Sequence, residues 1–342
     1  MTAPYPWLED SWRRLADYHA AGRVPHALLL TGPAGLGKVE LARGFLNRLL
    51  CRDTENVPCG QCDACAQWQA GSHPDFHEVT LEEDDKGKLR KQIVVDQVRA
   101  LSAEMSLTAR QGGWKVALIQ PADAMNVNAA NSLLKTLEEP PPQSLLLLVS
   151  SRPANLPATI RSRCQQLAVP RPSMEASLGW LRAEGVRQPE LALAYARGVP
   201  LRAKALTDGD FLRQRGELLQ RVAAVQDRGA SAVTVAGEFE ARDSAAVIEF
   251  LDAVTEDLVR LVQLPGDVAR LRNPDLLNSL KTLADRVNLT ALHRYRQALA
   301  EARRLAETPV NARMLLETLL LPWAAGMNAA TNERVLDRLL EG

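Results

Sequence analysis

The stretch HALLLTGPAGLGKVELARGFLNRLL, residues 26–50, carries the strongest structural signal in this sequence. It opens with an apolar run, turns through glycines and continues with apolar residues at helical spacing, a pattern typical of strand, loop and helix. The glycines let backbone N–H groups converge on phosphate oxygens, and the lysine at the start of the helix can reach the terminal phosphates. The candidate nucleotide-binding residues are therefore Gly32, Gly35, Gly37 and Lys38. A tight turn without a ligand fits the same pattern.

Further strand-like runs and helical patterns alternate with each other along the first half of the chain. The runs are DFHEVT (75–80), KVALIQ (115–120) and SLLLLVSS (144–151), and the helical patterns cover 38–50, 94–106 and 126–138. Short apolar strands separated by helices predict a parallel sheet covered on both faces, which is a doubly wound α/β fold.

After residue 173 the strand-like runs stop and helical patterns follow, as in 245–264 and 311–321. We therefore expect three parts. These are an α/β domain (1–168), a small helical lid domain (169–207) and an all-α domain (208–342), with TDGD (207–210) as a hinge.

Length and composition exclude several classes of protein. The 342 residues suffice for two or three domains, and no apolar run approaches the roughly 18 residues that span a bilayer. Lys plus Arg and Asp plus Glu are 41 each, so no net field draws the whole chain to DNA or to an anionic membrane. The beginning MTAPYPWLEDSWRRL has no signal-peptide core, and we expect a cytoplasmic protein.

The phosphate loop lacks the residues that normally hold magnesium. Val39 stands where this motif usually has Ser or Thr, and its methyl groups offer no oxygen to Mg²⁺. The run 115–119 is followed by Gln120 and Pro121 in place of acidic residues, and Asp123 comes three residues later. We therefore do not expect ATP hydrolysis at this chain's own site, while nucleotide binding without hydrolysis remains open.

Four of the five cysteines form the cluster CRDTENVPCGQCDAC. The spacing C-x7-C-x2-C-x2-C predicts a closed, structural Zn²⁺ site, with an iron–sulfur cluster as the alternative. The candidate ligands are Cys51, Cys59, Cys62 and Cys65. Because four thiolates complete the shell, His73 and His77 are not expected to be ligands. Cys164 is expected to be a packed thiol.

The stretch KVALIQPADAMNVNAANSLLKTLEEPPPQSLLLLVSSRPANLPATIRSRC (115–164) resembles the clamp-loader branch of the AAA+ ATPases, as found in the bacterial DNA polymerase III. The matching motifs are NSLLKTLEEPP (131–141) and LPATIRSRC (156–164), beside the phosphate loop and the cysteine cluster. The resemblance implies an AAA+ domain with an inserted zinc module, a helical lid and an all-α collar, although the helical pattern alone also fits a free-standing bundle. The replaced residues around the phosphate loop place the chain with the degenerate, non-motor subunits.

The same resemblance assigns roles to two arginines. Arg163, in the motif Ser-Arg-Cys (162–164), matches the arginine finger that projects into the ATP site of the neighbouring subunit. A surface ion pair is the simpler alternative. Arg202, in ARGVPLRAKAL (196–206), corresponds to an arginine that senses nucleotide from the lid, or is a surface arginine. Tyr5, Trp7 and Trp12 are expected to pack rather than to cover an adenine ring.

The function that this reading favours is a non-catalytic, stator-like subunit that supports ATP-dependent loading of a sliding clamp onto primed DNA. The implied partners are the motor and delta subunits, the clamp, and primer-template DNA through the assembled complex. One alternative is an active ATPase that uses Lys38 with Asp123 as an improvised metal ligand. Another is an independent zinc-containing nucleic-acid-binding protein, against which the balanced charge argues.

Overall fold

The computed structural model of the chain describes residues 3–53, 57–84, 87, 89–207, 210–240, 242–306, 308 and 310–327. The chain divides into two compact units, Met1–Trp180 and Leu181–Gly342. The boundary falls inside helix α7 (Met174–Ala183), so the three-part division expected from the sequence stays a prediction. Of the expected hinge, residues 208 and 209 lie outside the described residues.

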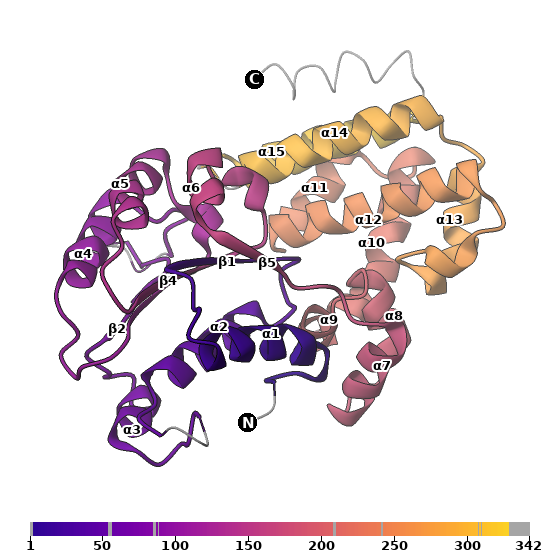
Figure 1. Ribbon diagram of the computed structural model, residues 1–342. Helices are drawn as coiled ribbons and strands as arrows, with labels where there is room; N and C mark the ends of the chain where they lie inside the picture. Colours follow the sequence, from indigo (N-terminus) through magenta and orange to yellow (C-terminus); the bar gives the residue numbers. More distant parts are fainter. Residues whose placement is uncertain are drawn as a thin grey trace. The chain divides into compact units, whose positions relative to one another are not determined.

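The first unit is built on a five-stranded parallel sheet in the order β2-β3-β4-β1-β5 (Figure 1). The strands are β1 (Ala27–Thr31), β2 (Phe76–Val79), β3 (Lys115–Ile119), β4 (Ser144–Ser150) and β5 (Gln165–Ala168). All four neighbouring pairs are parallel, which confirms the α/β fold expected from the sequence. The register pairs Thr31 with Ser150, so the loops after β1 and β4 begin side by side.

Strand β5 was not expected as a separate strand. It lies at the edge of the sheet, and three of its four residues are exposed, so it lacks the continuous apolar run that reveals β1, β3 and β4. Every residue of those three central strands is buried, because helices cover both faces of the sheet.

Helices lie on both sides of this sheet, as Figure 1 shows. One face carries α1 (Glu9–Ala20) and α2 (Lys38–Leu50), and the other carries α4 (Val95–Ser106), α5 (Val127–Glu138) and α6 (Ala158–Arg163). The short elements are η1 (Pro6–Leu8), α3 (Asp63–Gln69), η2 (Ala122–Ala124) and η3 (Pro153–Asn155). Asn126 starts α5 by accepting a hydrogen bond from the backbone N–H of Ala129 at 2.8 Å, which satisfies a donor of the first turn.

Alternate residues of the central strands point to opposite layers. Leu29, Ala117 and Leu148 belong to one buried cluster with the apolar residues of α4, α5 and α6. Their strand neighbours face the other side, where α2 contacts β1, β3 and β4. The resulting core fixes the ends of the strands, at which the phosphate loop lies.

The second unit is helical throughout its described part, as expected. Its helices are α8 (Pro189–Tyr195), α9 (Pro200–Thr207), α10 (Phe211–Gln226), α11 (Ala232–Glu240), α12 (Ser244–Gln263), α13 (Leu277–Ala284), α14 (Leu289–Leu305) and α15 (Ala312–Ala324), with η4 (Val268–Arg270) and η5 (Pro274–Leu276). Helix α12 is buried along most of its length and contacts α13 and α14. Trp323 is fully buried beside Tyr295, whose hydroxyl donates to the carbonyl of Leu319 at 2.8 Å.

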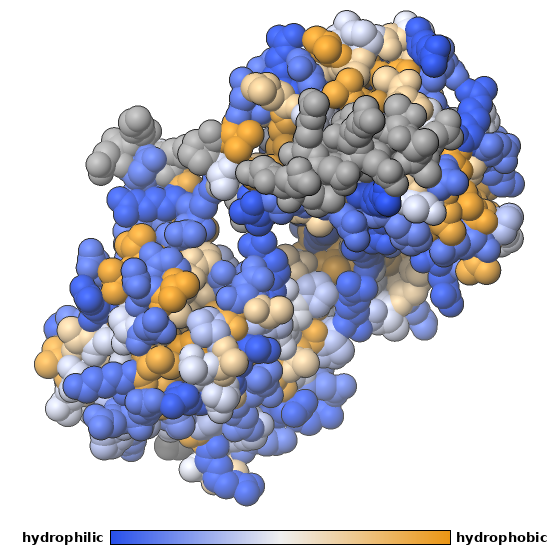
Figure 2. Space-filling view, turned by 90° about the horizontal axis from the view of Figure 1, so that it is seen from above, coloured by the Kyte–Doolittle hydropathy of each residue, from blue (hydrophilic) through white to orange (hydrophobic). Residues whose placement is uncertain are grey.

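The surface mixes hydrophilic and hydrophobic residues, and Figure 2 shows the hydrophobic ones scattered among the hydrophilic ones on one face. The most exposed large apolar side chains, Val127, Met174 and Met314, belong to three different helices. None of the helices in the described part of the chain is long and apolar enough to cross a membrane.

Candidate functional site

The phosphate loop connects β1 to α2 at the carboxyl edge of the sheet. Gly32, Gly35 and Gly37 all have positive φ angles, of 142°, 85° and 81°. At Gly37 a Cβ atom would lie 2.5 Å from the ring of Tyr5, and at Gly32 it would lie 2.7 Å from the carbonyl oxygen of Val169. Two of the three glycines are therefore required by close packing as well as by backbone conformation.

The side chain of Lys38 turns back onto this loop. Its Nζ atom donates to the carbonyl oxygens of Gly32 and Pro33, each at 2.7 Å, and to Ser151 Oγ at 3.1 Å. The residue is only 4% exposed, and burial lowers its pKa to about 8, with Asp123 and Glu40 opposing the shift. In this arrangement the ammonium group is bound to the loop and to Ser151. It would have to leave the loop carbonyls to bind a phosphate.

The positions at which the sequence pattern would place magnesium-binding residues lie in the first turn of α2 and after β3. Val39 is half-buried in the first turn of α2, and Gln120 follows β3. The side-chain amide of Gln120 donates to Glu78 at 3.3 Å, and Glu78 is itself bound by Arg43 at 2.7 and 2.8 Å. The carboxylate nearest to the end of β3 along the chain is that of Asp123.

Asp123 precedes α5 and anchors the end of β4. Its side chain accepts hydrogen bonds from Ser150 Oγ at 2.7 Å, from the backbone N–H of Ser151 at 3.0 Å and from Arg152 Nε at 3.3 Å. Burial alone would raise its pKa, but these donors outweigh burial and leave the pKa below its usual value. An ionised carboxylate with three donors is already satisfied by the protein, so it is poorly placed to become an improvised metal ligand.

Arg163 lies at the last position of α6, where its side chain is 37% exposed. Its guanidinium donates to Glu138 at 2.6 Å and to the carbonyl oxygen of Thr159 at 3.1 Å. Glu138 ends α5 and belongs to the NSLLKTLEEPP stretch, so the two sequence motifs of the resemblance meet at this ion pair. Cys164, the next residue, is buried in the core, and burial raises its pKa to about 11, which fits a packed thiol.

The four clustered cysteines converge as the spacing predicted. Their Sγ atoms all lie within 4.8 Å of one another, with Cys51 to Cys62 at 3.9 Å and Cys59 to Cys65 at 4.0 Å. A tetrahedral ion with Zn–S bonds of about 2.3 Å requires Sγ atoms about 3.8 Å apart, so the donor set fits such an ion. Within the described part of the chain, this metal-capable group contains neither of the two nearby histidines.

Backbone donors orient these thiolates. The N–H groups of Cys59 and Cys62 point to the sulfurs of Cys51 and Cys59, both at 3.3 Å. The ligands come from the end of α2, the following loop and the start of α3, so a bound ion would tie these elements together. Two histidines that follow in sequence have other partners, since His73 accepts from the backbone N–H of Asp75 and His77 lies 3.9 Å from Glu104.

Arg202 lies on α9 in the second unit and forms an ion pair with Glu249 of α12. Burial, then the neighbouring charge of Arg272, lowers the pKa of its guanidinium. Of the three aromatic residues near the N-terminus, Trp12 is buried on α1, and the other two pack on each other. Tyr5 and Trp7 stack with ring centroids 5.0 Å apart.

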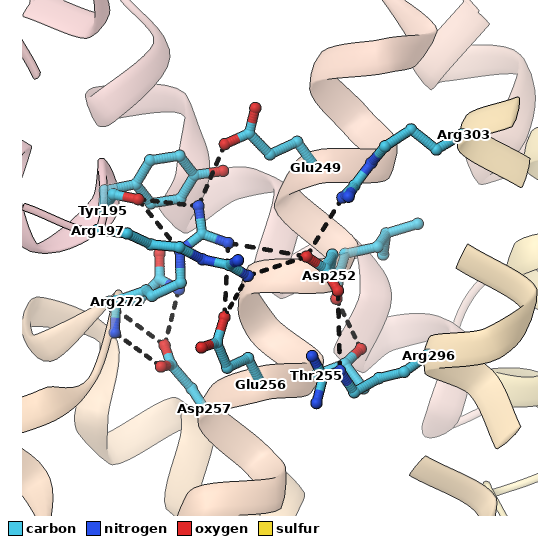
Figure 3. Close-up of polar contacts among 12 residues, drawn as sticks. Tyr195, Arg197, Glu249, Asp252, Thr255, Glu256, Asp257, Arg272, Arg296 and Arg303 are labelled. Carbon is cyan, nitrogen blue, oxygen red and sulfur yellow. Dashed lines mark hydrogen bonds and ion pairs between the residues drawn. The ribbon is translucent and has the colours of Figure 1, made fainter. Parts of the chain in front are cut away.

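Sequence reasoning missed three features of the site. It did not anticipate Ser151 as a partner of Lys38, Glu138 as a partner of Arg163, or the arginine cluster around Asp252 in the second unit (Figure 3). For the pair of Arg163 and Glu138, the motif that contains Glu138 was a usable signal. The other two depend on residues brought together from distant parts of the chain, for which the sequence holds no local signal.

Comparisons with known proteins agree over most of the chain. A family model described as "DNA polymerase III, delta subunit" matches residues 7–173, and one described as "DNA polymerase III, delta subunit, C terminal" matches residues 209–325. The DNA polymerase III subunit delta' of Pseudomonas aeruginosa is 36% identical over 94% of this chain and 97% of its own length. That of Yersinia pestis is 32% identical over 96% and 97%, and that of Escherichia coli is 37% identical over 64% and 65%.

These matches confirm the family that the motifs indicated and refine it to one kind of subunit. The match extends over the sheet, the cysteine cluster and most of the helical unit. The chain belongs to the delta' family of DNA polymerase III subunits.

Proposed function

We propose that this chain is a stator-like subunit of the replicative clamp loader, which supports loading of the sliding clamp onto primed DNA without hydrolysing ATP itself. It would act in the cytoplasm beside motor and delta subunits, and would meet primer-template DNA within the assembled complex. The chain would offer Arg163 to the ATP bound by the neighbouring motor subunit.

One observation carries this proposal. The chain has Val39 after its phosphate loop, and Gln120 and Pro121 after β3, at the positions that would bind magnesium, whereas Arg163 is partly exposed at the end of a helix. A guanidinium delivered from outside neutralises charge on the transferring γ-phosphoryl group, and such a finger is worth about 10³–10⁵ in rate. Its present partner, Glu138, is half exposed, so separating the pair costs less than about 1 kcal/mol.

The four cysteines would hold a structural Zn²⁺, whose four thiolate ligands leave no open coordination position for catalysis.

The phosphate loop keeps its glycines and Lys38, and for this reason we propose that it can hold ATP or ADP weakly. Binding would require Lys38 to leave the two loop carbonyls, and it would depend little on Mg²⁺ because Val39 offers no oxygen. Arg202 would influence such binding only after release from Glu249.

The test is DNA-stimulated ATP hydrolysis by the loader reconstituted with wild-type chain, Arg163→Ala or Arg161→Ala. Arg161 is the matched control, because it carries the same charge on the same helix two residues earlier. We expect the loader with Arg163→Ala to assemble normally, as judged by size-exclusion chromatography. Its ATP hydrolysis should fall by at least the share of the one motor-subunit site that this chain faces. Unchanged hydrolysis with Arg163→Ala, or an equal loss with Arg161→Ala, would refute the finger assignment.

An active ATPase is the competing function, since Lys38 and Asp123 lie near the same loop. Purified chain alone should show no ATP turnover above the level of Lys38→Ala, with or without primed DNA. ATP hydrolysis by the wild-type chain that Lys38→Ala abolishes would refute the stator assignment and identify the chain as a motor subunit.

A further inference from the structure

A cluster of arginines surrounds a single carboxylate in the second unit (Figure 3). Asp252 Oδ2 lies 3.2 Å from Arg197 and from Arg303, and 4.0 Å from Arg272, while Oδ1 lies 3.9 Å from Arg296. The arginines come from α14, from the turn after α8 and from the segment between α12 and α13. Nothing in the proposed function uses this cluster.

The buried side of the cluster is well neutralised. Arg272 is 4% exposed and donates to Glu249 at 3.1 Å and to the carbonyl oxygen of Tyr195 at 2.8 Å. Arg197 donates to Glu256 at 2.5 Å. Glu249 and Glu256 therefore neutralise Arg272 and Arg197, while Asp252 is shared by Arg197, Arg296 and Arg303.

The outer side carries an excess of positive charge. Arg296 is 41% and Arg303 is 49% exposed, and the contact of Arg296 with Asp252 is too long for a hydrogen bond. A hollow of about 420 Å³ opens here, lined by Arg197, Asp252, His293, Arg296, Gln297, Ala300 and Arg303. Three guanidinium groups and one carboxylate line it, and because Arg197 is also paired with Glu256, the excess comes from Arg296 and Arg303.

Helix α14 supplies most of this lining at one helical face. Its positions 293, 296, 297, 300 and 303 follow a spacing of three and four residues, so they form a row about 15 Å long at 1.5 Å per residue. One strand of a nucleic acid places a phosphate at about every 3.4 Å of helix axis. The row can therefore face more than one phosphate, and the small side chain of Ala300 leaves room for them.

The chemistry of the lining favours nucleic acid over an acidic protein segment. Protein partners bind through buried aromatic or aliphatic anchors at the centre of an interface, and this lining offers only Ala300 as an apolar side chain. Guanidinium groups bind phosphate oxygens through paired N–H donors, and nucleic-acid interfaces are rich in positive charge. We propose that this surface of α14, with Arg197 beside it, binds the phosphate backbone of a nucleic-acid strand.

The inference does not rest on the proposed function, because it concerns the isolated chain. The test is the fluorescence anisotropy of a fluorescein-labelled strand of 20 thymidines, titrated with full-length wild-type chain, Arg296→Gln, Arg303→Gln or Arg304→Gln between 50 and 200 mM NaCl. Arg304 is the matched control, since it is the next residue on the same helix and is already paired with Glu301 at 3.0 Å.

Each phosphate contact on a single strand contributes about −0.7 to the slope of log K against log salt. Arg296→Gln and Arg303→Gln should each reduce the slope by about 0.7, which corresponds to about fivefold weaker binding at 0.1 M salt. Arg304→Gln should leave both quantities near those of wild type, and Arg303→Lys should restore most of the slope.

Three results would overturn the proposal. These are wild-type binding that does not depend on salt, equal losses in Arg303→Gln and Arg304→Gln, and displacement of the strand by poly-glutamate as effectively, charge for charge, as by unlabelled strand. The last outcome would reassign the surface to an acidic protein segment. Thermal melting of each variant shows whether the substitution has left the fold intact.

Discussion

Replacement of Lys38 by Met tests whether this lysine is buried against its own loop. The side chain is 4% exposed, and burial lowers its pKa from 10.5 to about 8. In the unfolded chain the lysine returns to its ordinary pKa. Between about pH 8 and pH 10.5 the unfolded chain therefore keeps a proton that the folded chain has released.

The sign and size of the pH effect follow from this difference. Because the unfolded state binds more protons, the free energy of unfolding rises with pH across that window, and the charged lysine costs stability most fully below pH 8. From pH 7 to pH 9 the folded chain loses most of the proton, which amounts to about one pKa unit or about 1.4 kcal/mol. Little of this is screened by solvent, since the side chain is buried.

The assay is urea denaturation at pH 7, 8 and 9, followed by tryptophan fluorescence, of wild type, Lys38→Met and the control Lys135→Met, which removes an exposed lysine. The free energy of unfolding of wild type minus that of Lys38→Met should increase by about 1.4 kcal/mol from pH 7 to pH 9. A difference that stays constant over this range, or one that Lys135→Met reproduces, would refute the buried placement of Lys38.

Three further predictions follow from the first unit. Wild-type chain should contain one zinc ion by atomic absorption, and the Cys65→Ser variant should lose the metal and melt at a lower temperature. A variant that retains a full equivalent of zinc would exclude Cys65 as a ligand. Glu138→Gln should change the ATPase rate of the reconstituted loader by at most about fivefold, because an exposed ion pair contributes less than about 1 kcal/mol. A loss as large as that of Arg163→Ala would instead make Glu138 essential. Asp75→Ala should destabilise the chain by about 2–4 kcal/mol in urea denaturation, since Asp75 is 1% exposed and accepts from two backbone N–H groups at 2.7 and 3.0 Å; a loss below about 0.5 kcal/mol would contradict its structural role.

Much of the α/β unit could be predicted because its strands are buried on both faces. Continuous apolar runs located β1, β3 and β4 to within a residue or two at each end, and α2, α4 and α5 began within one residue of the expected positions. Strand β5 could not be predicted in this way, because an edge strand with exposed Gln165 and Gln166 has no continuous apolar run. Cysteine spacing alone located the metal-capable cluster, since its ligands lie close together in sequence.

The pairing of side chains could not be predicted in the same way. Lys38 contacts Ser151, which is 113 residues away, and Arg163 contacts Glu138, which is 25 residues away. Such contacts depend on which strand lies beside which, and an α/β pattern alone does not specify strand order. The two arginines that line the hollow on α14, Arg296 and Arg303, could not be recognised for another reason. Their charges are balanced by acidic residues elsewhere in the chain, so the net charge of zero conceals a local excess.

The packing of the N-terminal segment against the phosphate loop gives the molecule an intrinsic optical probe. The indole N–H of Trp7 donates to the carbonyl oxygen of Leu36 at 3.0 Å, and Tyr5 fills the space beside Gly37. Any ligand that reshapes the loop must change the polarity around this indole, and with it the emission wavelength of Trp7. Difference spectra between wild type and Trp7→Phe would isolate that one fluorophore, so occupancy of the loop can be followed without labelling the nucleotide or the protein.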